Sequence, residues 1–173
     1  PQVALNFSQA VGTFLGSGKV VVGRDSRITG EMVRNAVVSG LLAVGCDVID
    51  VGICSTPTIQ MAVEKLKAHG GIAVTASHNP IEWNALKLID SSGMFFDEKQ
   101  GEKVISIVEG NKFNFVSWEK IGKINVYKNA IEDHIQAILK LKYIDEERIA
   151  SKKFEVVVDC VNGAGGTILP TLL

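Results

Sequence analysis

The sequence predicts a three-layer α/β/α fold built around a mixed, mainly parallel sheet, followed by the start of a second, similar unit. Short β-branched runs alternate with segments whose apolar residues recur every three or four positions. Glycines punctuate the joins, as at Gly16, Gly18, Gly23 and Gly45. Repeated strand–helix alternation implies a parallel sheet with helices on both faces.

The first half of the chain is predicted to form three successive helix–strand pairs. Val3, Phe7 and Phe14 mark one apolar face of an opening helix that ends near Gly16. Asp47 begins a second strand after the turn at Gly45. The predicted strands are 19–22, 47–51 and 71–75, and the predicted helices are 3–14, about 30–43 and 58–68.

Further along, 85–89 alternates as a fourth strand and 91–93 forms a turn. Asp97 is the expected N-cap of the next helix, with Gln100 in the capping-box position. Periodicity fails over 112–123, so we place a boundary there and divide the chain into 1–118, one complete domain, and 119–173, an incomplete second one. In that second part we expect a helix over 130–141, a strand over 154–159 and a small-residue turn over 162–166.

Composition excludes several classes of partner. Eighteen Lys plus Arg balance nineteen Asp plus Glu, giving a net charge of -1, so no global field favours nucleic acid or an anionic membrane. No apolar run approaches the roughly 20 residues of a membrane span. Cys46, Cys54 and Cys160 lack metal-site spacing, and we expect three small buried side chains in a cytoplasmic protein.

The hexapeptide 75–80, Thr-Ala-Ser-His-Asn-Pro, carries the strongest chemical signal. It follows a buried strand, at the sheet edge where α/β proteins bind ligands. Ser77, His78 and Asn79 can all face an oxyanion, although the same residue types also make ordinary turns. His78 is poorly placed as a base for a hydrolytic serine, because adjacent side chains on an extended turn point apart. The alternative is that Ser77 itself carries a phosphoryl group.

A phosphorylated serine needs cations around it. Lys87 lies in the predicted strand 85–89, on the opposite face from Leu86 and Leu88. Arg24 and Arg27 follow the first strand, at the same end of a parallel sheet. Each of these three could also be an ordinary surface charge, and Asp25 an ion-pair partner of little weight.

Taken together, Gly23-Arg-Asp-Ser-Arg27, the hexapeptide and Asn84 to Lys87 resemble the α-D-phosphohexomutase superfamily, whose lysine also lies ten residues after the serine. The segment 156–166 is similar to the opening of that family's second domain. The resemblance implies that Ser77 is the phosphoserine, that a phosphate oxygen on Ser77 is a Mg²⁺ ligand, and that His78 and Lys87 are catalytic.

By the same resemblance, Arg24, Arg27 and Asn79 support the phosphate and its loop. The implied reaction interconverts hexose 6-phosphate and hexose 1-phosphate, a phosphosugar substrate class, through a hexose 1,6-bisphosphate intermediate. The remaining domains of the same enzyme are the implied partners.

The sequence departs from the family pattern at Asn84-Ala85, where Asn-Gly is usual, so we expect no positive φ there. The family's magnesium loop, sugar-selecting loop and C-terminal phosphate loop are absent from these residues, and we expect the chain alone to be inactive. The alternative is a non-catalytic sugar-phosphate-binding or regulatory module of the same fold. A serine hydrolase ranks third, since no G-x-S-x-G elbow is present.

Overall fold

A five-stranded sheet forms the centre of the computed structural model, which describes residues 1–173. The strand order is β4-β3-β1-β2-β5. All neighbouring pairs are parallel except β3 and β4, which are antiparallel, so the sheet is mixed and mainly parallel. The strands are β1 (Lys19–Arg24), β2 (Asp47–Ile53), β3 (Gly70–Val74), β4 (Leu86–Asp90) and β5 (Ile124–Val126).

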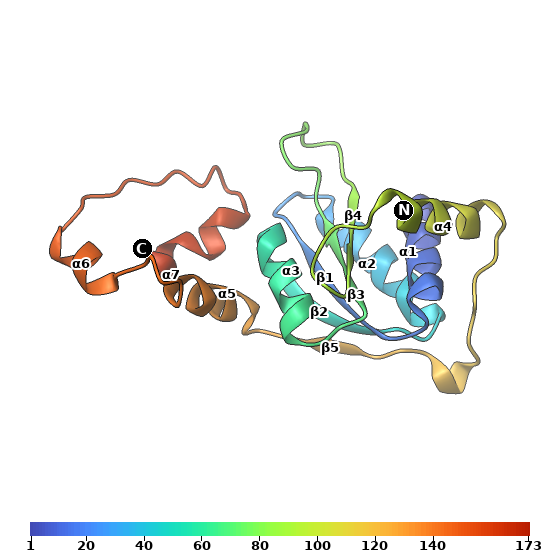
Figure 1. Ribbon diagram of the computed structural model, residues 1–173. Coiled ribbons are helices and arrows are strands. Elements are labelled where there is room, and N and C mark those ends of the chain that lie inside the picture. The colour runs from blue at the N-terminus through green and yellow to red at the C-terminus, as the bar shows by residue number, and fades with distance from the viewer.

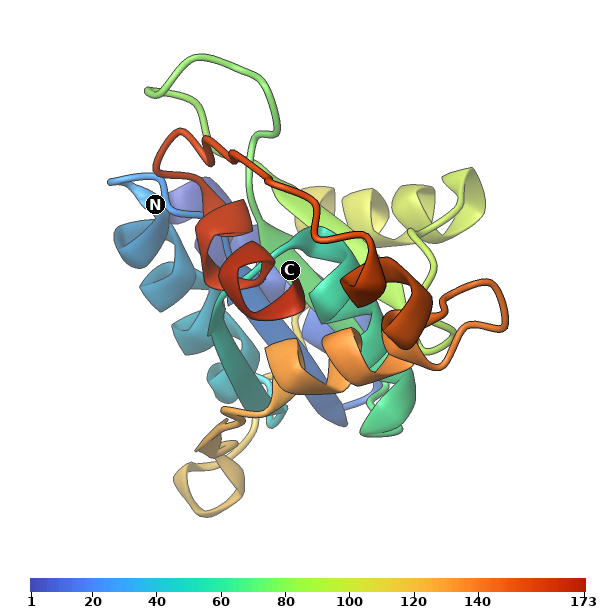
Figure 2. The ribbon, with the colours of Figure 1, turned by 90° about the vertical axis from the view of Figure 1, so that its left-hand side faces the viewer.

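Helices cover both faces of this sheet, which confirms the predicted three-layer fold (Figures 1 and 2). One face carries α1 (Gln2–Leu15), α2 (Gly30–Ala43) and α4 (Glu98–Glu109), whereas the other carries α3 (Thr56–Lys65) and α5 (Ala130–Leu139). The short helices α6 (Glu146–Ser151) and α7 (Leu169–Leu172) and the 3₁₀ turns η1 (Trp118–Lys120) and η2 (Ala164–Thr167) complete the chain.

The central strand β1 shows why the sheet is buried on both sides. Val20 and Val22 point into the core beneath α1, α2 and α4, while Val21 points into the core beneath α3. All three have no exposed surface. A run of β-branched residues without polar alternation is what a strand covered on both faces requires.

Two termini in this framework follow from local chemistry. The helix α1 ends at Gly16, whose φ of 74° is the left-handed conformation that glycine adopts without steric cost. The helix α4 begins with the predicted capping box. The Asp97 side chain accepts from the Gln100 backbone N–H at 2.8 Å, and the Gln100 side-chain oxygen accepts from the Asp97 backbone N–H at 2.9 Å.

Two elements beyond residue 118 join the same layers. The strand β5 pairs with β2, and α5 packs against α3. The residue at which a second domain begins stays a prediction.

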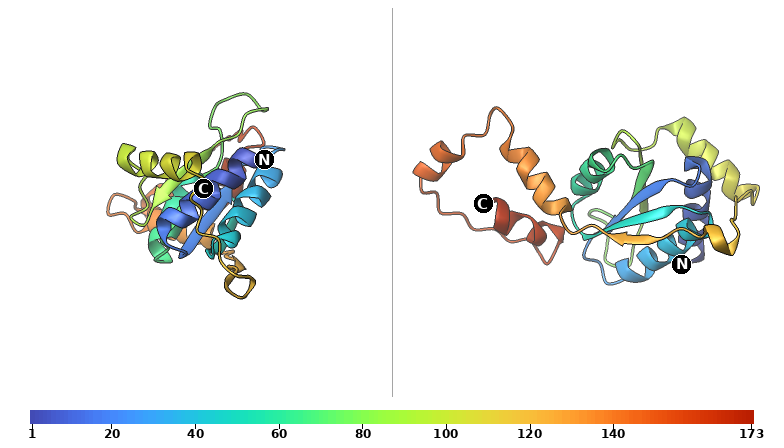
Figure 3. Two further views of the ribbon diagram at one scale, coloured as in Figure 1. Left: turned by 90° about the vertical axis from the view of Figure 1, so that its right-hand side faces the viewer. Right: turned by 90° about the horizontal axis from the view of Figure 1, so that it is seen from below.

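The predicted strand over 154–159 is wrong. These residues have no regular secondary structure, and Val157 is 99% exposed. Figure 3 shows this C-terminal stretch lying beyond α3 and away from the sheet. Its apolar composition favours a strand, but a strand needs a neighbouring strand to pair with its backbone N–H and C=O groups.

Two of the three cysteines are buried as expected. Burial, reinforced by the nearby charge of Asp47, raises the pKa of Cys46 to about 11; burial and the charge of Asp50 raise that of Cys54 to about 12. Cys160 is only partly buried. None of the helices combines the length and apolar character needed to cross a membrane.

Candidate active site

The two predicted motifs meet at the carboxyl ends of β1 and β3. These strands are parallel neighbours, with Arg24 opposite Val74, so the residues that follow each strand leave the sheet side by side. The Asp25 amide donates to the Val74 carbonyl at 3.1 Å and fixes the start of both loops. The longer loop, residues 75–85, which we call the serine loop, connects β3 to β4 and projects beyond the sheet (Figure 1).

Ser77 is exposed in this loop and its backbone is unusual. Its φ of 54° lies in the left-handed region, which a non-glycine residue adopts at a cost of about 1–2 kcal/mol. Its N–H donates to the Thr75 hydroxyl at 3.2 Å. Such a conformation persists only where the surroundings hold it, and it presents the hydroxyl outward.

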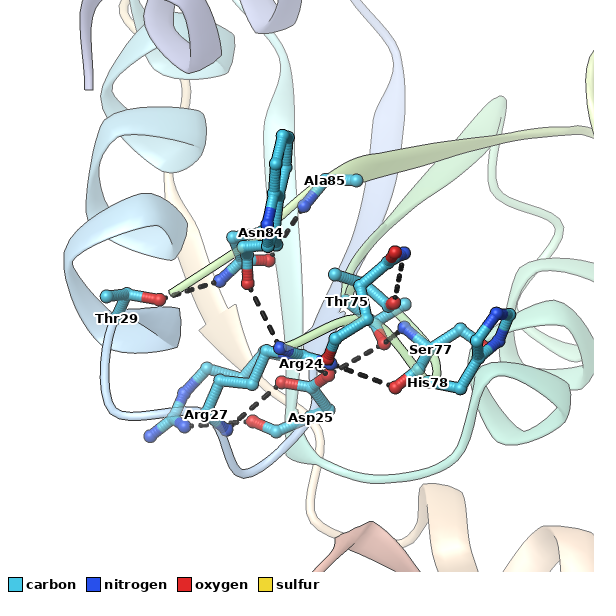
Figure 4. A network of polar contacts seen from close by, with 12 residues as sticks. Arg24, Asp25, Arg27, Thr29, Thr75, Ser77, His78, Asn84 and Ala85 are labelled. Carbon is cyan, nitrogen blue, oxygen red and sulfur yellow. Dashed lines mark hydrogen bonds and ion pairs between the residues drawn. The ribbon is translucent and has the colours of Figure 1, made fainter. Parts of the chain in front are cut away.

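Asp25 is the hub of the hydrogen bonds that hold this turn (Figure 4). Its carboxylate accepts from the Thr75 hydroxyl at 2.7 Å and from the Arg27 backbone N–H and Nε, each at 3.1 Å. A continuous chain therefore runs from Arg27 through Asp25 and Thr75 to the Ser77 amide. Sequence reasoning missed this role for Asp25 and Thr75; their positions just past two adjacent parallel strands were the available signal.

Arg27 lies under the serine loop, with its side chain only 11% exposed. Besides Asp25, its guanidinium contacts four backbone carbonyl oxygens of the loop. These belong to Ser77, Asn79, Pro80 and Trp83.

His78 and Asn79 are both exposed beside Ser77. The His78 Nδ1 lies 3.4 Å from the Ser77 Oγ, a long contact brought about by the left-handed turn rather than the extended one we expected. The Asn79 side-chain amide donates to the Ala76 carbonyl at 2.9 Å, as does its backbone N–H at 3.0 Å. Asn79 thus closes the turn that carries the serine.

The side chains of the other two predicted cations, Lys87 and Arg24, make no hydrogen bond to Ser77. Leu86 and Leu88 pack against the core while Lys87 takes the opposite face, and its Nζ lies 5.6 Å from the centre of the Phe95 ring. No hydrogen bond joins Lys87 to the serine loop. Arg24 donates from Nη1 to the Asp25 carbonyl at 3.1 Å and lines a small cavity with Thr75 and the start of α3.

The far end of the serine loop is anchored to α2. The Asn84 side-chain amide donates to the Thr29 hydroxyl at 3.3 Å, and the Ala85 backbone N–H donates to the Asn84 side-chain oxygen at 3.0 Å. Neither Asn84 nor Ala85 has a positive φ, as the departure from Asn-Gly predicts.

Metal ligands are few around the serine. No group of three or more His, Cys, Asp or Glu side chains gathers anywhere in the described chain. The Asp25 carboxylate, which contacts the Thr75 hydroxyl, already accepts three hydrogen bonds. The described chain therefore holds no preformed cluster of side chains that could bind Mg²⁺ by itself.

Fold and site together define an α/β/α domain with an exposed serine in a loop that Arg27 holds by hydrogen bonds. The loop lies at the carboxyl ends of parallel strands, where α/β sheets bind ligands. Residues 1–115 match the family model described as "Phosphoglucomutase/phosphomannomutase, alpha/beta/alpha domain I". The chain belongs to the phosphoglucomutase/phosphomannomutase family.

Two relatives agree with this assignment. The chain is 43% identical over 178 residues to a phosphoglucomutase/phosphomannomutase of Thermococcus kodakarensis, covering 100% of this chain and 38% of that protein. It is 40% identical over 172 residues to a "Probable phosphoglucosamine mutase" of Pyrococcus abyssi, covering 99% and 37%. The chain thus spans little more than a third of the length of these relatives.

The fold is shared with pp63/parafusin, a phosphoglucomutase from Paramecium, in its open form. The TM-score is 0.72 at 20% sequence identity, with 97% of this chain and 37% of that chain covered. At this identity the likeness shows the fold alone.

Proposed function

We propose that this chain is the serine-bearing domain of a phosphohexomutase, in which Ser77 stores a phosphoryl group and exchanges it with a hexose phosphate. The observation that carries the proposal is the exposed Ser77 hydroxyl, held in a left-handed turn by the Arg27–Asp25–Thr75 chain at the carboxyl end of β3. Family membership supports this reaction class over hydrolysis.

The proposed transfer has two matched steps. In the first, the bond between Ser77 Oγ and phosphorus breaks as a sugar hydroxyl forms its own bond to phosphorus; a nearby base takes the sugar hydroxyl proton, and a proton is delivered to the departing Ser77 Oγ. The product is a hexose 1,6-bisphosphate. In the second, the Ser77 hydroxyl bonds to the other phosphorus and gives up its proton, and the sugar oxygen that is released receives a proton. Positioning and charge neutralisation dominate such chemistry.

Two side chains are proposed to serve the transfer directly. His78 has a ring nitrogen 3.4 Å from the Ser77 Oγ, within reach of a proton or of the phosphoryl oxygens. Lys87 would have to leave the Phe95 ring to reach the same place, a change of side-chain rotamer at a partly buried position. Its charge would then balance the dianionic phosphoserine.

Mg²⁺ is proposed as a cofactor held jointly. A phosphate oxygen on Ser77 supplies one ligand, and the carboxylates that complete the site come from residues outside this chain. When bound, the ion supplies Lewis-acid neutralisation of the phosphoryl charge. The remaining domains of the enzyme, the sugar-phosphate substrate and a cytoplasmic location belong to the same proposal.

The proposal is tested by turnover of a hexose 1-phosphate in the full-length protein, with Mg²⁺ and a hexose 1,6-bisphosphate present. We expect Ser77→Ala to lower kcat by at least about 10³-fold, because the covalent store is lost. Ser91→Ala is the matched control, since Ser91 is an exposed turn serine after β4. Wild-type turnover in Ser77→Ala would refute the role. Sugar-phosphate binding without any turnover would favour the non-catalytic module.

A further inference from the structure

The Arg27 guanidinium has no donor left for a phosphate. Arginine offers five side-chain N–H groups. Nε–H donates to Asp25 at 3.1 Å; Nη1 donates to the Pro80 and Trp83 carbonyls at 2.6 and 3.2 Å; Nη2 donates to the Ser77 and Asn79 carbonyls at 2.9 and 2.8 Å. Every N–H group therefore has a partner inside the protein.

Few other contacts fix the backbone conformation of the serine loop. Residues 77–83 are all exposed, so no apolar core holds them, and they pair with no strand. Four of their carbonyl oxygens nevertheless converge on one point, which costs free energy unless a donor satisfies them together. The Arg27 guanidinium is that donor, and the hydrogen bond from its Nε to the Asp25 carboxylate fixes its orientation.

We infer that Arg27 is a positioning residue that folds the serine loop and holds Ser77 in its left-handed turn, and that it makes no contact with the phosphoryl group. The catalytic part of this inference rests on the proposed function. The charge of the phosphoserine is then met by other cations. The Arg24 side chain makes one hydrogen bond to the protein and retains free donors, in contrast to that of Arg27.

Lysine at this position distinguishes the two roles. A lysine ammonium is a compact charge with three donors on a flexible stem, so it can still attract a phosphate but cannot reproduce a planar five-donor fork. If Arg27 were a phosphate ligand, Arg27→Lys would keep much of its effect. A positioning role predicts that Arg27→Lys fails nearly as badly as Arg27→Ala.

The first test needs no activity and uses the 173-residue chain. Chymotrypsin cleaves after Trp83 only when the loop backbone opens, and the Trp83 carbonyl is one of the oxygens that Arg27 holds. We expect Arg27→Lys to speed this cut, followed by mass spectrometry, by about tenfold, with cleavage at Tyr143 unchanged as an internal reference. Arg34→Lys, which alters another ion-paired arginine, is the matched control. Unchanged resistance at Trp83 in Arg27→Lys would overturn the inference.

The second test measures catalysis in the full-length protein. We expect Arg27→Lys to lower kcat by about 10²-fold while the KM for the sugar phosphate changes little, because the nucleophile is misplaced and the substrate is not. Near-wild-type kcat in Arg27→Lys would contradict the positioning role. If the cut at Trp83 behaves as expected but wild-type protein shows no mutase turnover, the loop assignment stands and the proposed function fails.

Discussion

At the scale of single residues, the left-handed backbone of Ser77 links stability to the proposed chemistry. A serine at φ 54° carries strain that a glycine would not. We predict that Ser77→Gly raises the free energy of unfolding by about 0.5–1 kcal/mol, whereas Ser77→Ala leaves it nearly unchanged. Urea denaturation of both variants checks this. Equal stability of the two would show that the turn is not strained.

The Thr75 hydroxyl is the second residue-scale feature, because it accepts from the Ser77 amide and donates to Asp25. Thr75→Val keeps the shape of this buried side chain but removes both hydrogen bonds. We predict a loss of about 1–3 kcal/mol in the free energy of unfolding, with Thr75→Ser close to wild type. Urea denaturation measures the free energy of unfolding of both variants. Wild-type stability in Thr75→Val would show that the two hydrogen bonds of Thr75 do not stabilise the loop.

At the scale of elements, α4 depends on its capping box. The helix has one buried residue, Val104, so little core packing compensates for a lost cap. We predict that Asp97→Ala lowers the free energy of unfolding by about 1 kcal/mol. Lys99→Ala, on the exposed first turn of the same helix, should change it by less than about 0.5 kcal/mol. Chemical denaturation of the two variants side by side gives the comparison, and equal effects would argue against the box.

The contact between α3 and α5 includes an ion pair with a pH signature. Burial raises the pKa of Asp133, but hydrogen bonds from Lys65 and Tyr127 and the charge of Lys65 outweigh it and hold that pKa below its usual value. A lowered carboxyl pKa adds stability above the unfolded pKa, and this stability is lost as pH falls through the folded pKa.

We therefore predict that part of the stability of the chain is lost progressively as the pH falls below about 5 and through the lowered pKa of Asp133. In Asp133→Asn that part should already be missing at pH 7, and the acid slope should be shallower. Glu132→Gln removes a neighbouring carboxylate that has no ion pair and serves as the control. Thermal unfolding at stepped pH values measures the slope, and identical slopes in wild type and Asp133→Asn would contradict the account.

At the scale of the whole molecule, the pattern of the sequence predicts the layers well. Within two of the predicted strands, residues 20–22 and 72–74 are continuous apolar runs because both faces of the sheet are covered, and Gly16 and Gly45 mark joins with positive φ. The capping box at Asp97 is equally readable, since it depends on local residues alone.

Contacts between distant segments were harder to predict. From the local sequence alone, Asp25 and Arg27 could equally be surface charges, because nothing nearby shows that a loop fifty residues later folds over them; only the family resemblance implied a supporting role for Arg27. The strand β5 is only three residues long and has no buried side chain, and so short a segment gives no reliable periodicity. The apolar run 154–159 gave the opposite error, since strand formation depends on a neighbour as much as on composition.

The central claim is that the Ser77 oxygen carries a phosphoryl group, and the intact mass of the full-length protein after exposure to a hexose 1,6-bisphosphate tests it most directly. The account predicts a species heavier by about 80 Da in the wild type and its absence in Ser77→Ala, with Ser91→Ala retaining it. An 80 Da increment of the same size in Ser77→Ala, or none in the wild type, would contradict the account.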